Sequence, residues 1–164
     1  MALYETSALI TAPVEYCFNA WMQFDEFPDT MPCVREVRRT GEQTSHWRVV
    51  VVGREAQWDA KIISLVPNRS ITWKTHNGLS GGGTVAFYDT RPDFNGCRVA
   101  VLIEYNPPYG LLGDLVDICG FEAAFRRAVL ESLAAFKQRV ETSFAATAEG
   151  RELAAAGPPA RRRH

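Results

Sequence analysis

A long amphipathic stretch near the carboxyl end decides the fold: residues 111–140 read LLGDLVDICGFEAAFRRAVLESLAAFKQRV. Its apolar side chains recur every three or four residues and so share one face of a helix. They are Leu115, Phe121, Phe125, Val129, Ser132 or Leu133, Phe136 and Val140. A helix of roughly 30 residues would be about 45 Å long. Such a helix needs a cover for its aromatic face, and only the chain before it can supply one.

The amino-acid composition is typical of an ordinary globular protein. The 164 residues suit one domain, and a net charge of −1 gives no bias toward nucleic acid or a membrane surface. The amino terminus lacks the pattern of a secretory signal, and no apolar run is long enough to span a bilayer. We therefore expect a cytoplasmic protein that does not bind nucleic acid and has no transmembrane segment.

The four cysteines are spaced too widely for a zinc site or a redox motif. They are Cys17, Cys33, Cys97 and Cys119. We expect them to be small buried hydrophobic residues in a reducing compartment.

The chain before the long helix reads as strands with two short helices. Alternation predicts a first strand at 4–11, and helical spacing predicts short helices at 13–21 and from residue 24 to Pro32. After Pro32, apolar and polar side chains alternate with a period of two residues, which is typical of strands. Further strands are predicted at 34–39, 45–52, 57–66, 70–76, 84–89 and 97–105.

Turn residues separate these strands. Asn77-Gly78 with Gly81-Gly82-Gly83, and Asn95-Gly96, are the strongest hairpin signals. Gaps this short join antiparallel neighbours, so the strands should form a meander.

The alternation assigns the two faces of the sheet. One face is apolar and aromatic, and it includes Trp47, Trp58, Trp73, Phe87 and Tyr105. The other face of the sheet is charged, as expected for an antiparallel sheet with one face exposed to solvent. The long helix must lie across the apolar face, where the rings either fill the core or line a hydrophobic cavity.

In this order of elements the chain resembles the START-like (SRPBCC) superfamily, and in particular its polyketide cyclase/dehydrase and coenzyme Q-binding-protein-like family. The resemblance covers roughly residues 4–142. It rests on Ala12-Pro13-Val14, the run Trp21…Phe24…Phe27-Pro28, Trp58-Asp59-Ala60-Lys61-Ile62, Pro67-Asn68-Arg69-Ser70-Ile71-Thr72-Trp73, Gly83-Thr84-Val85-Ala86-Phe87 and Tyr105-Asn106-Pro107-Pro108.

The resemblance implies an α+β helix-grip (START/Bet v 1-like) fold. In this fold a curved antiparallel sheet wraps around a long C-terminal helix, and two short helices follow the first strand. It also implies a cavity between sheet and helix for a lipid, quinone or polyketide. We expect the ligand to contact Trp47, Trp58, Trp73, Thr75, Phe87, Tyr105, Tyr109, Phe121, Phe125 and Val129.

An enzyme is the alternative hypothesis, because a subset of this family are aromatase/cyclases. The members that this chain resembles use an inward arginine near the end of the strand that precedes a Val-Pro-Asp/Asn turn. Here that stretch holds Ser64 and Leu65, and Arg69 lies past the turn, so the arginine position is not matched.

General acid–base chemistry would need a titratable group in the cavity. The alternation places His46, His76, Asp59, Lys61, Lys74 and Glu104 on the wet face, although a strand bulge would invert part of this assignment. Tyr105, Tyr109, Thr75 and Asp114 are better placed, near the mouth. We predict no metal and no cofactor, and we leave the catalytic residues unassigned.

The composition changes at the carboxyl end, where Gly157-Pro158-Pro159 precedes three arginines. We predict a ligand-binding domain at 1–143 and a flexible Ala/Pro/Arg-rich tail at 144–164. Contact of the tail with a protein partner, and a homodimer, remain open.

Overall fold

The computed structural model describes residues 2–51, 53–106 and 115–156, without the side chains of residues 54 and 115–119. Its strands are β1 Ala2–Ile10, β2 Val34–Arg39, β3 Thr44–Val51, β4 Arg54–Val66, β5 Ser70–Gly78, β6 Gly81–Asp89 and β7 Cys97–Tyr105. Its helices are α1 Val14–Met22, the 3-10 helix η1 Phe24–Glu26, α2 Phe27–Thr30, α3 Leu115–Ala145 and α4 Ala148–Ala156.

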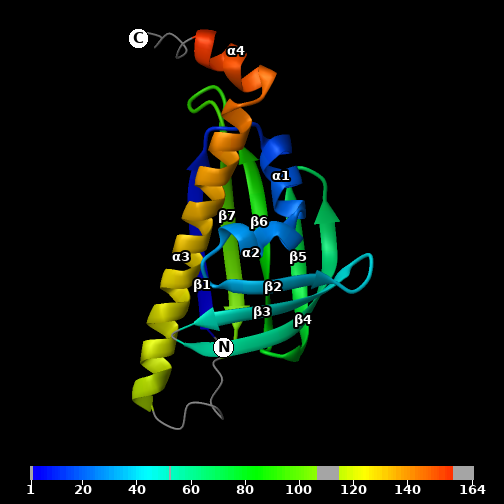
Figure 1. Ribbon diagram of the computed structural model, residues 1–164, viewed down its shortest axis with the longest axis vertical. Coiled ribbons are helices and arrows are strands. Elements are labelled where there is room, and N and C mark those ends of the chain that lie inside the picture. Colours follow the sequence, from blue (N-terminus) through cyan, green and yellow to red (C-terminus); the bar gives the residue numbers. More distant parts are fainter. Residues whose placement is uncertain (1, 52, 107–114, 157–164) are drawn as a thin grey trace.

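The strands form one antiparallel sheet in the order β1-β7-β6-β5-β4-β3-β2. Strands β2 to β7 follow one another as the predicted meander, and β1 pairs with β7 from Ala2 opposite Tyr105 to Ile10 opposite Cys97. The sheet curls strongly, so that in Figure 1 β2 and β3 run across the molecule while β1, β6 and β7 run along it. This arrangement confirms the predicted helix-grip fold.

Helix α3 lies across the open side of the curved sheet. It contacts β1 at one edge of the sheet and β3 near the other edge, strands that are far apart in the sheet order. Figure 1 shows the helix lying along the open side of the curved sheet. Its side chains Phe136 and Val140 are each only 1% exposed, because they enter the centre of the core.

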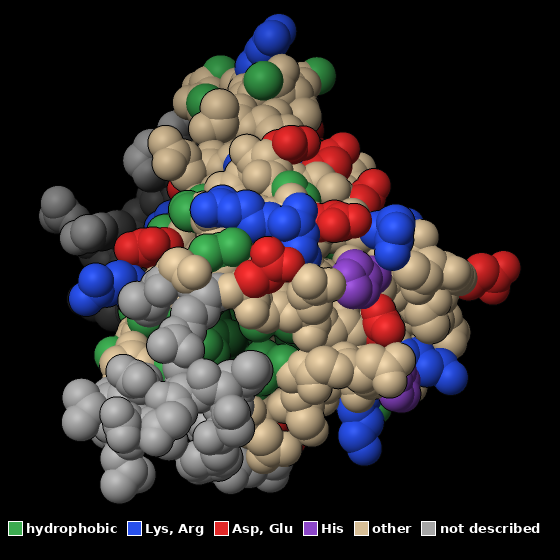
Figure 2. All heavy atoms as spheres, turned by 60° about the horizontal axis from the view of Figure 1, so that its bottom comes forward, with side chains coloured by type: hydrophobic (Ala, Val, Ile, Leu, Met, Phe, Trp, Pro, Cys, Tyr) green, Lys and Arg blue, Asp and Glu red, His purple; other side chains and the backbone are tan. Residues whose placement is uncertain are grey.

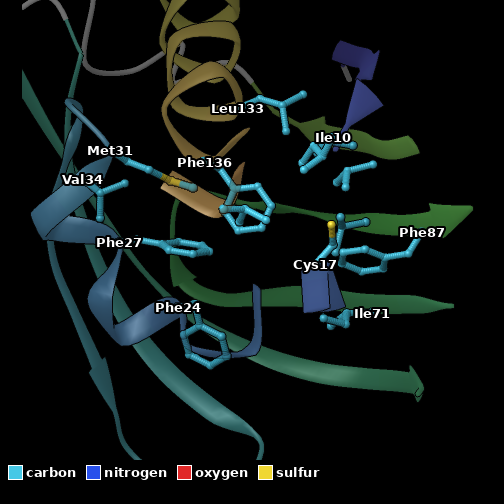
Figure 3. Close-up of a cluster of buried hydrophobic side chains, with 14 of the residues drawn as sticks. Ile10, Cys17, Phe24, Phe27, Met31, Val34, Ile71, Phe87, Leu133 and Phe136 are labelled. Carbon is cyan, nitrogen blue, oxygen red and sulfur yellow. The ribbon is translucent and has the colours of Figure 1, made fainter. Parts of the chain in front are cut away.

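Helices α1 and α2 cover part of the concave face beside α3 (Figure 1). The Trp21 ring of α1 lies 5.0 Å edge-on from Phe136, and Phe27 of α2 lies 6.4 Å from the same ring. Figure 3 shows Phe136 near the middle of the buried side chains, with the Phe27 ring beside it. The short helices therefore fill the part of the core that α3 alone leaves open.

The long helix extends further toward the carboxyl end than predicted. Its last turn buries Phe144, which is 5% exposed and packs edge-on against the Tyr16 ring at 5.2 Å. Helix α4 then packs against α3. Residues 111–114 of the predicted helix and 157–164 of the tail lie outside the described residues, and the division after residue 143 remains a prediction.

Two of the cysteines are buried as predicted. Cys17 and Cys97 are both 0% exposed, and Cys33 is half-buried. The side chain of Cys119 lies outside the described part of the chain.

Replacing Phe136 by alanine should lower the free energy of unfolding by about 3–5 kcal/mol, because it removes a fully buried ring and leaves a cavity. Leu130→Ala on the same helix is the control. This side chain is 50% exposed, and its loss should change stability by no more than about 0.5 kcal/mol. Urea unfolding followed by circular dichroism measures both, and equal effects would contradict this placement of α3.

Candidate ligand-binding cavity

A cavity of about 200 Å³ lies between the concave face of the sheet and α3. Figure 2 shows a hollow with hydrophobic side chains inside it, on the face that forms the bottom of Figure 1. Strands β3 to β7 line the cavity with Ser45, Trp47, Val49, Val51, Trp58, Ala60, Ile62, Ile71, Trp73, Thr75, Gly81, Gly82, Val101, Ile103, Glu104 and Tyr105. The remaining lining residues are Trp21, Phe24, Phe27, Met31, Cys33, Val34, Leu79, Ser80, Phe125, Ala128, Val129, Ser132 and Leu133.

One wall of the cavity is a stack of aromatic rings. Trp47 and Trp58 are cross-strand partners, and their rings lie 6.2 Å apart at an interplanar angle of only 7°. Phe24 stacks on Trp47 at 5.8 Å. The indole N–H of Trp47 donates a hydrogen bond to Ser45 Oγ at 2.8 Å, which fixes that ring in place. Neighbouring rings thus hold one another flat along this wall.

The triple glycine makes room for a third tryptophan. The sequence places Gly81, Gly82 and Gly83 in a turn, whereas in the structure they belong to strand β6. Gly83 is the cross-strand partner of Trp73, and a Cβ atom there would lie 2.5 Å from Cζ2 of the indole. Glycine is therefore required for the close approach of the Trp73 ring to this strand.

Helix α3 forms the opposite wall through Phe125, Val129 and neighbouring residues. The Phe125 ring lies 4.4 Å from that of Tyr105, at the end of β7. The few polar groups of the lining are mostly engaged within the protein. Thr75, for example, accepts a hydrogen bond from the Gly81 N–H at 2.7 Å and donates one to the Gly81 carbonyl oxygen at 3.0 Å.

The structure brings seven of the predicted ligand-binding residues to the cavity: Trp47, Trp58, Trp73, Thr75, Tyr105, Phe125 and Val129. Phe87 is not among the lining residues. It is 4% exposed and packs edge-on against Phe18 at 5.5 Å, deeper in the core. Phe121 is also absent from the lining and stacks beside Phe125 at 6.1 Å. Tyr109 lies outside the described residues.

The sequence pattern did not indicate that the segment between β1 and β2 contributes to the cavity. Trp21, Phe24, Phe27, Met31 and Cys33 all line the cavity. A signal was present, because Trp21, Phe24 and Phe27 follow one another at a spacing of three residues. The periodicity of such short helices does not show which larger element their rings face.

The ionisable groups of the sheet lie mainly on its outer face, as the alternation predicts. His46 Nδ1 lies 2.7 Å from Asp59 Oδ1, and Asn77 Nδ2 donates to the other carboxyl oxygen at 3.3 Å. The hydrogen bond with His46, and then that from Asn77, hold the pKa of Asp59 below its usual value. Two irregularities interrupt the β4–β5 register, and Asp59 nevertheless remains on the outer face.

Most other described charged groups of the sheet are also outside, and the exception is Glu104, an exposed residue that borders the cavity. Arg48 forms ion pairs with Glu36 at 3.4 Å and with Glu55 at 3.6 Å. Lys61, Lys74 and His76 are exposed, and both described histidines are visible on the surface in Figure 2. Arg69 is likewise exposed and does not line the cavity. Within the described residues, no group of three or more His, Cys, Asp or Glu side chains could hold a metal ion.

Fold and cavity together define a helix-grip domain of the START-like superfamily with an apolar interior. The family described as polyketide cyclase / dehydrase and lipid transport matches residues 10–137, most of the chain. The chain belongs to this family. Among the described helices, none is both long and apolar enough to cross a membrane.

Known proteins that are similar to it include the following three. An uncharacterised 17.2 kDa protein from the melC2-rnhH intergenic region of Streptomyces lincolnensis is 29% identical over 108 residues, which cover 65% of this chain and 71% of that protein. The Zhui aromatase/cyclase of Streptomyces sp. R1128 has a TM-score of 0.73 at 18% identity, covering 91% of this chain and 98% of that one. A START superfamily protein of Mycobacterium smegmatis has a TM-score of 0.63 at 17% identity, covering 86% and 98%.

Gly83→Ala should lower the free energy of unfolding by about 1–3 kcal/mol, because the new methyl group overlaps the Trp73 ring and the Leu102 carbonyl oxygen. Gly120→Ala provides a control with the opposite sign. A Cβ at Gly120 in α3 would meet nothing within 4 Å, and the helix should gain about 0.5–1 kcal/mol. Thermal unfolding of both variants measures the difference, and a stable Gly83→Ala protein would contradict the role of this glycine.

The Asp59 carboxyl should titrate below its ordinary pKa of about 3.9 in the wild type and closer to that value in His46→Gln. Because the folded-state pKa is lowered, the pair stabilises the protein above about pH 4, and this contribution disappears as the pH falls through the folded-state pKa. Side-chain carboxyl NMR shifts measure the midpoint. An identical midpoint in both proteins would show that His46 does not act on Asp59.

Proposed function

We propose that this protein binds a small, uncharged hydrophobic molecule, polyketide-, quinone- or lipid-like, in the cavity between the sheet and α3. The observation that supports this most strongly is the lining itself. Residues from six strands, the three short helices and α3, most of them aromatic or aliphatic, surround one space. Apolar pockets of this kind with a few polar groups are the usual form of a small-molecule site.

The size of the cavity limits the part of the ligand that it can hold. An engineered cavity of about 150 Å³ with an apolar lining binds benzene. The cavity of about 200 Å³ is therefore large enough for a single ring or for two fused rings. A planar group could lie against the flat wall formed by Trp47 and Trp58. A longer chain would extend through the hollow seen in Figure 2.

The charge distribution favours a neutral ligand. Glu104 is the one formally charged residue among the described lining, and it is exposed. An ionised group inside this cavity would lose its hydration without gaining a counter-ion, which is strongly unfavourable. Fatty acids in their ionised form are therefore poorer candidates than ketones, quinones or phenols.

Cyclisation or dehydration of a bound polyketide is the second candidate function, supported by the family description. Such chemistry needs an acid or base within reach of the substrate. An inward orientation of Asp59, Arg48 or Glu104 would have favoured an enzyme. Arg48 instead forms ion pairs outside and Asp59 is hydrogen-bonded to His46, while Glu104 borders the cavity but is exposed. Binding is therefore the function that we favour, and turnover of a poly-β-ketone mimic by the wild type would reverse this preference.

Titration with 2-naphthol by isothermal calorimetry tests the binding site. Val129 lines the cavity, whereas the next residue, Leu130, is 50% exposed on the same helix. Val129→Trp should fill the space and weaken binding by at least about tenfold, equivalent to 1.4 kcal/mol. Leu130→Trp should leave the affinity within about twofold of the wild type, since a change of this size is well under 1 kcal/mol.

Melting temperatures of both variants show whether they remain folded. Failure of the wild type to bind 2-naphthol or the related two-ring probes would contradict the proposed function. Equal affinities of folded Val129→Trp and Leu130→Trp would place the binding site elsewhere.

A further inference from the structure

Tyr105 carries a buried polar atom without a partner. Its side chain is 2% exposed and lines the cavity at the end of β7. In the described part of the chain, its hydroxyl group is the one buried side-chain polar atom that forms no hydrogen bond. Buried hydroxyl groups are nearly always hydrogen-bonded in folded proteins, because an unpaired one has lost its bonds to water without replacement. The exception at Tyr105 therefore needs a physical explanation.

The other hydroxyl groups of the lining already have partners within the protein. The hydroxyl of Thr75 is bonded to the Gly81 backbone in both directions, as described above. The remaining pairs are Ser45 with the Trp47 indole, Ser80 with the Asn106 amide at 3.2 Å, and Ser132 with the Cys33 thiol at 3.3 Å. Tyr105 thus differs from every other described hydroxyl group that faces this cavity.

Packing holds the Tyr105 ring in position. Phe125 lies 4.4 Å from it and Phe121 lies 6.5 Å from it, both on α3. Burial, and then the nearby Glu122 carboxylate, raise the pKa of Tyr105, and Arg126 opposes this only in part. The phenol therefore stays protonated at neutral pH and can donate a hydrogen bond.

We infer that the natural ligand carries an uncharged oxygen acceptor, a ketone, quinone or phenol oxygen, that receives a hydrogen bond from the Tyr105 hydroxyl. This inference rests on the proposed function and narrows its ligand class. The rings of the cavity would hold the apolar skeleton, and Tyr105 would select molecules with oxygen at one edge. A purely hydrocarbon ligand would bind but would leave the hydroxyl unpaired.

Tetralin and 1-tetralone separate the two contributions, since they share a two-ring skeleton and differ by one carbonyl group. We expect the wild type to bind both compounds and to prefer 1-tetralone. Tyr105→Phe should weaken 1-tetralone binding about tenfold and leave tetralin within about twofold. Tyr88→Phe is the matched control, because the Tyr88 side chain is 48% exposed outside the cavity, and neither affinity should change.

Two further measurements do not depend on affinity. The carbonyl stretch of 1-tetralone bound to the wild type should lie below its frequency in an apolar solvent and should return to that frequency in Tyr105→Phe. Unliganded Tyr105→Phe should melt no lower than the wild type, because the hydroxyl that it lacks has no internal partner.

The outcomes distinguish the two proposals. If the wild type binds neither compound, both the proposed function and this inference fail. If tetralin and 1-tetralone bind equally well, or if Tyr105→Phe weakens both to the same extent, the cavity binds hydrophobic molecules but Tyr105 does not select oxygen. An unshifted carbonyl stretch in the wild type would likewise overturn the inference.

Discussion

The structure depends on one helix covering the concave face of a seven-stranded sheet. Helix α3 contacts β1 at one edge and β3 near the other, so the sheet must curl to bury the helix's apolar stripe. A helix with side chains is only about 10–12 Å wide, too narrow to fill the space inside such a curl. Rings from α1 and α2 fill part of it against Phe136. The space that remains is the cavity, a consequence of the architecture.

Packing around the cavity keeps this space open. The Trp47 and Trp58 rings are nearly parallel and hold each other against the sheet, and Gly83 allows Trp73 to lie close to β6. Rings supported in this way cannot easily rotate inward to fill the void. A site built from such rings offers shape and apolar contact, and among its described lining residues only Glu104, which is exposed, carries a formal charge. These features are the basis of our proposal that the interior binds a small hydrophobic molecule.

The sequence was sufficient for the fold and for most of the cavity wall, because side-chain alternation in strands directly reports which face is buried. It predicted the inward positions of Trp47, Trp58 and Trp73. Alternation shows that a side chain points inward, but it does not show whether that side chain reaches the cavity or is packed in the solid part of the core. For that reason it could not distinguish Tyr105, which lines the cavity, from Phe87, which is packed in the core. The glycines of β6 were assigned to a turn because glycine serves both in turns and where another group approaches closely.

Crystals held under xenon pressure test most directly whether the interior is an open apolar cavity, because xenon enters dry apolar spaces of this size. We expect xenon to occupy the space bounded by Trp58, Trp73 and Val129, with the surrounding rings in the positions described above. Absence of xenon, with side chains turned inward to fill that space, would contradict the existence of a binding cavity in this protein.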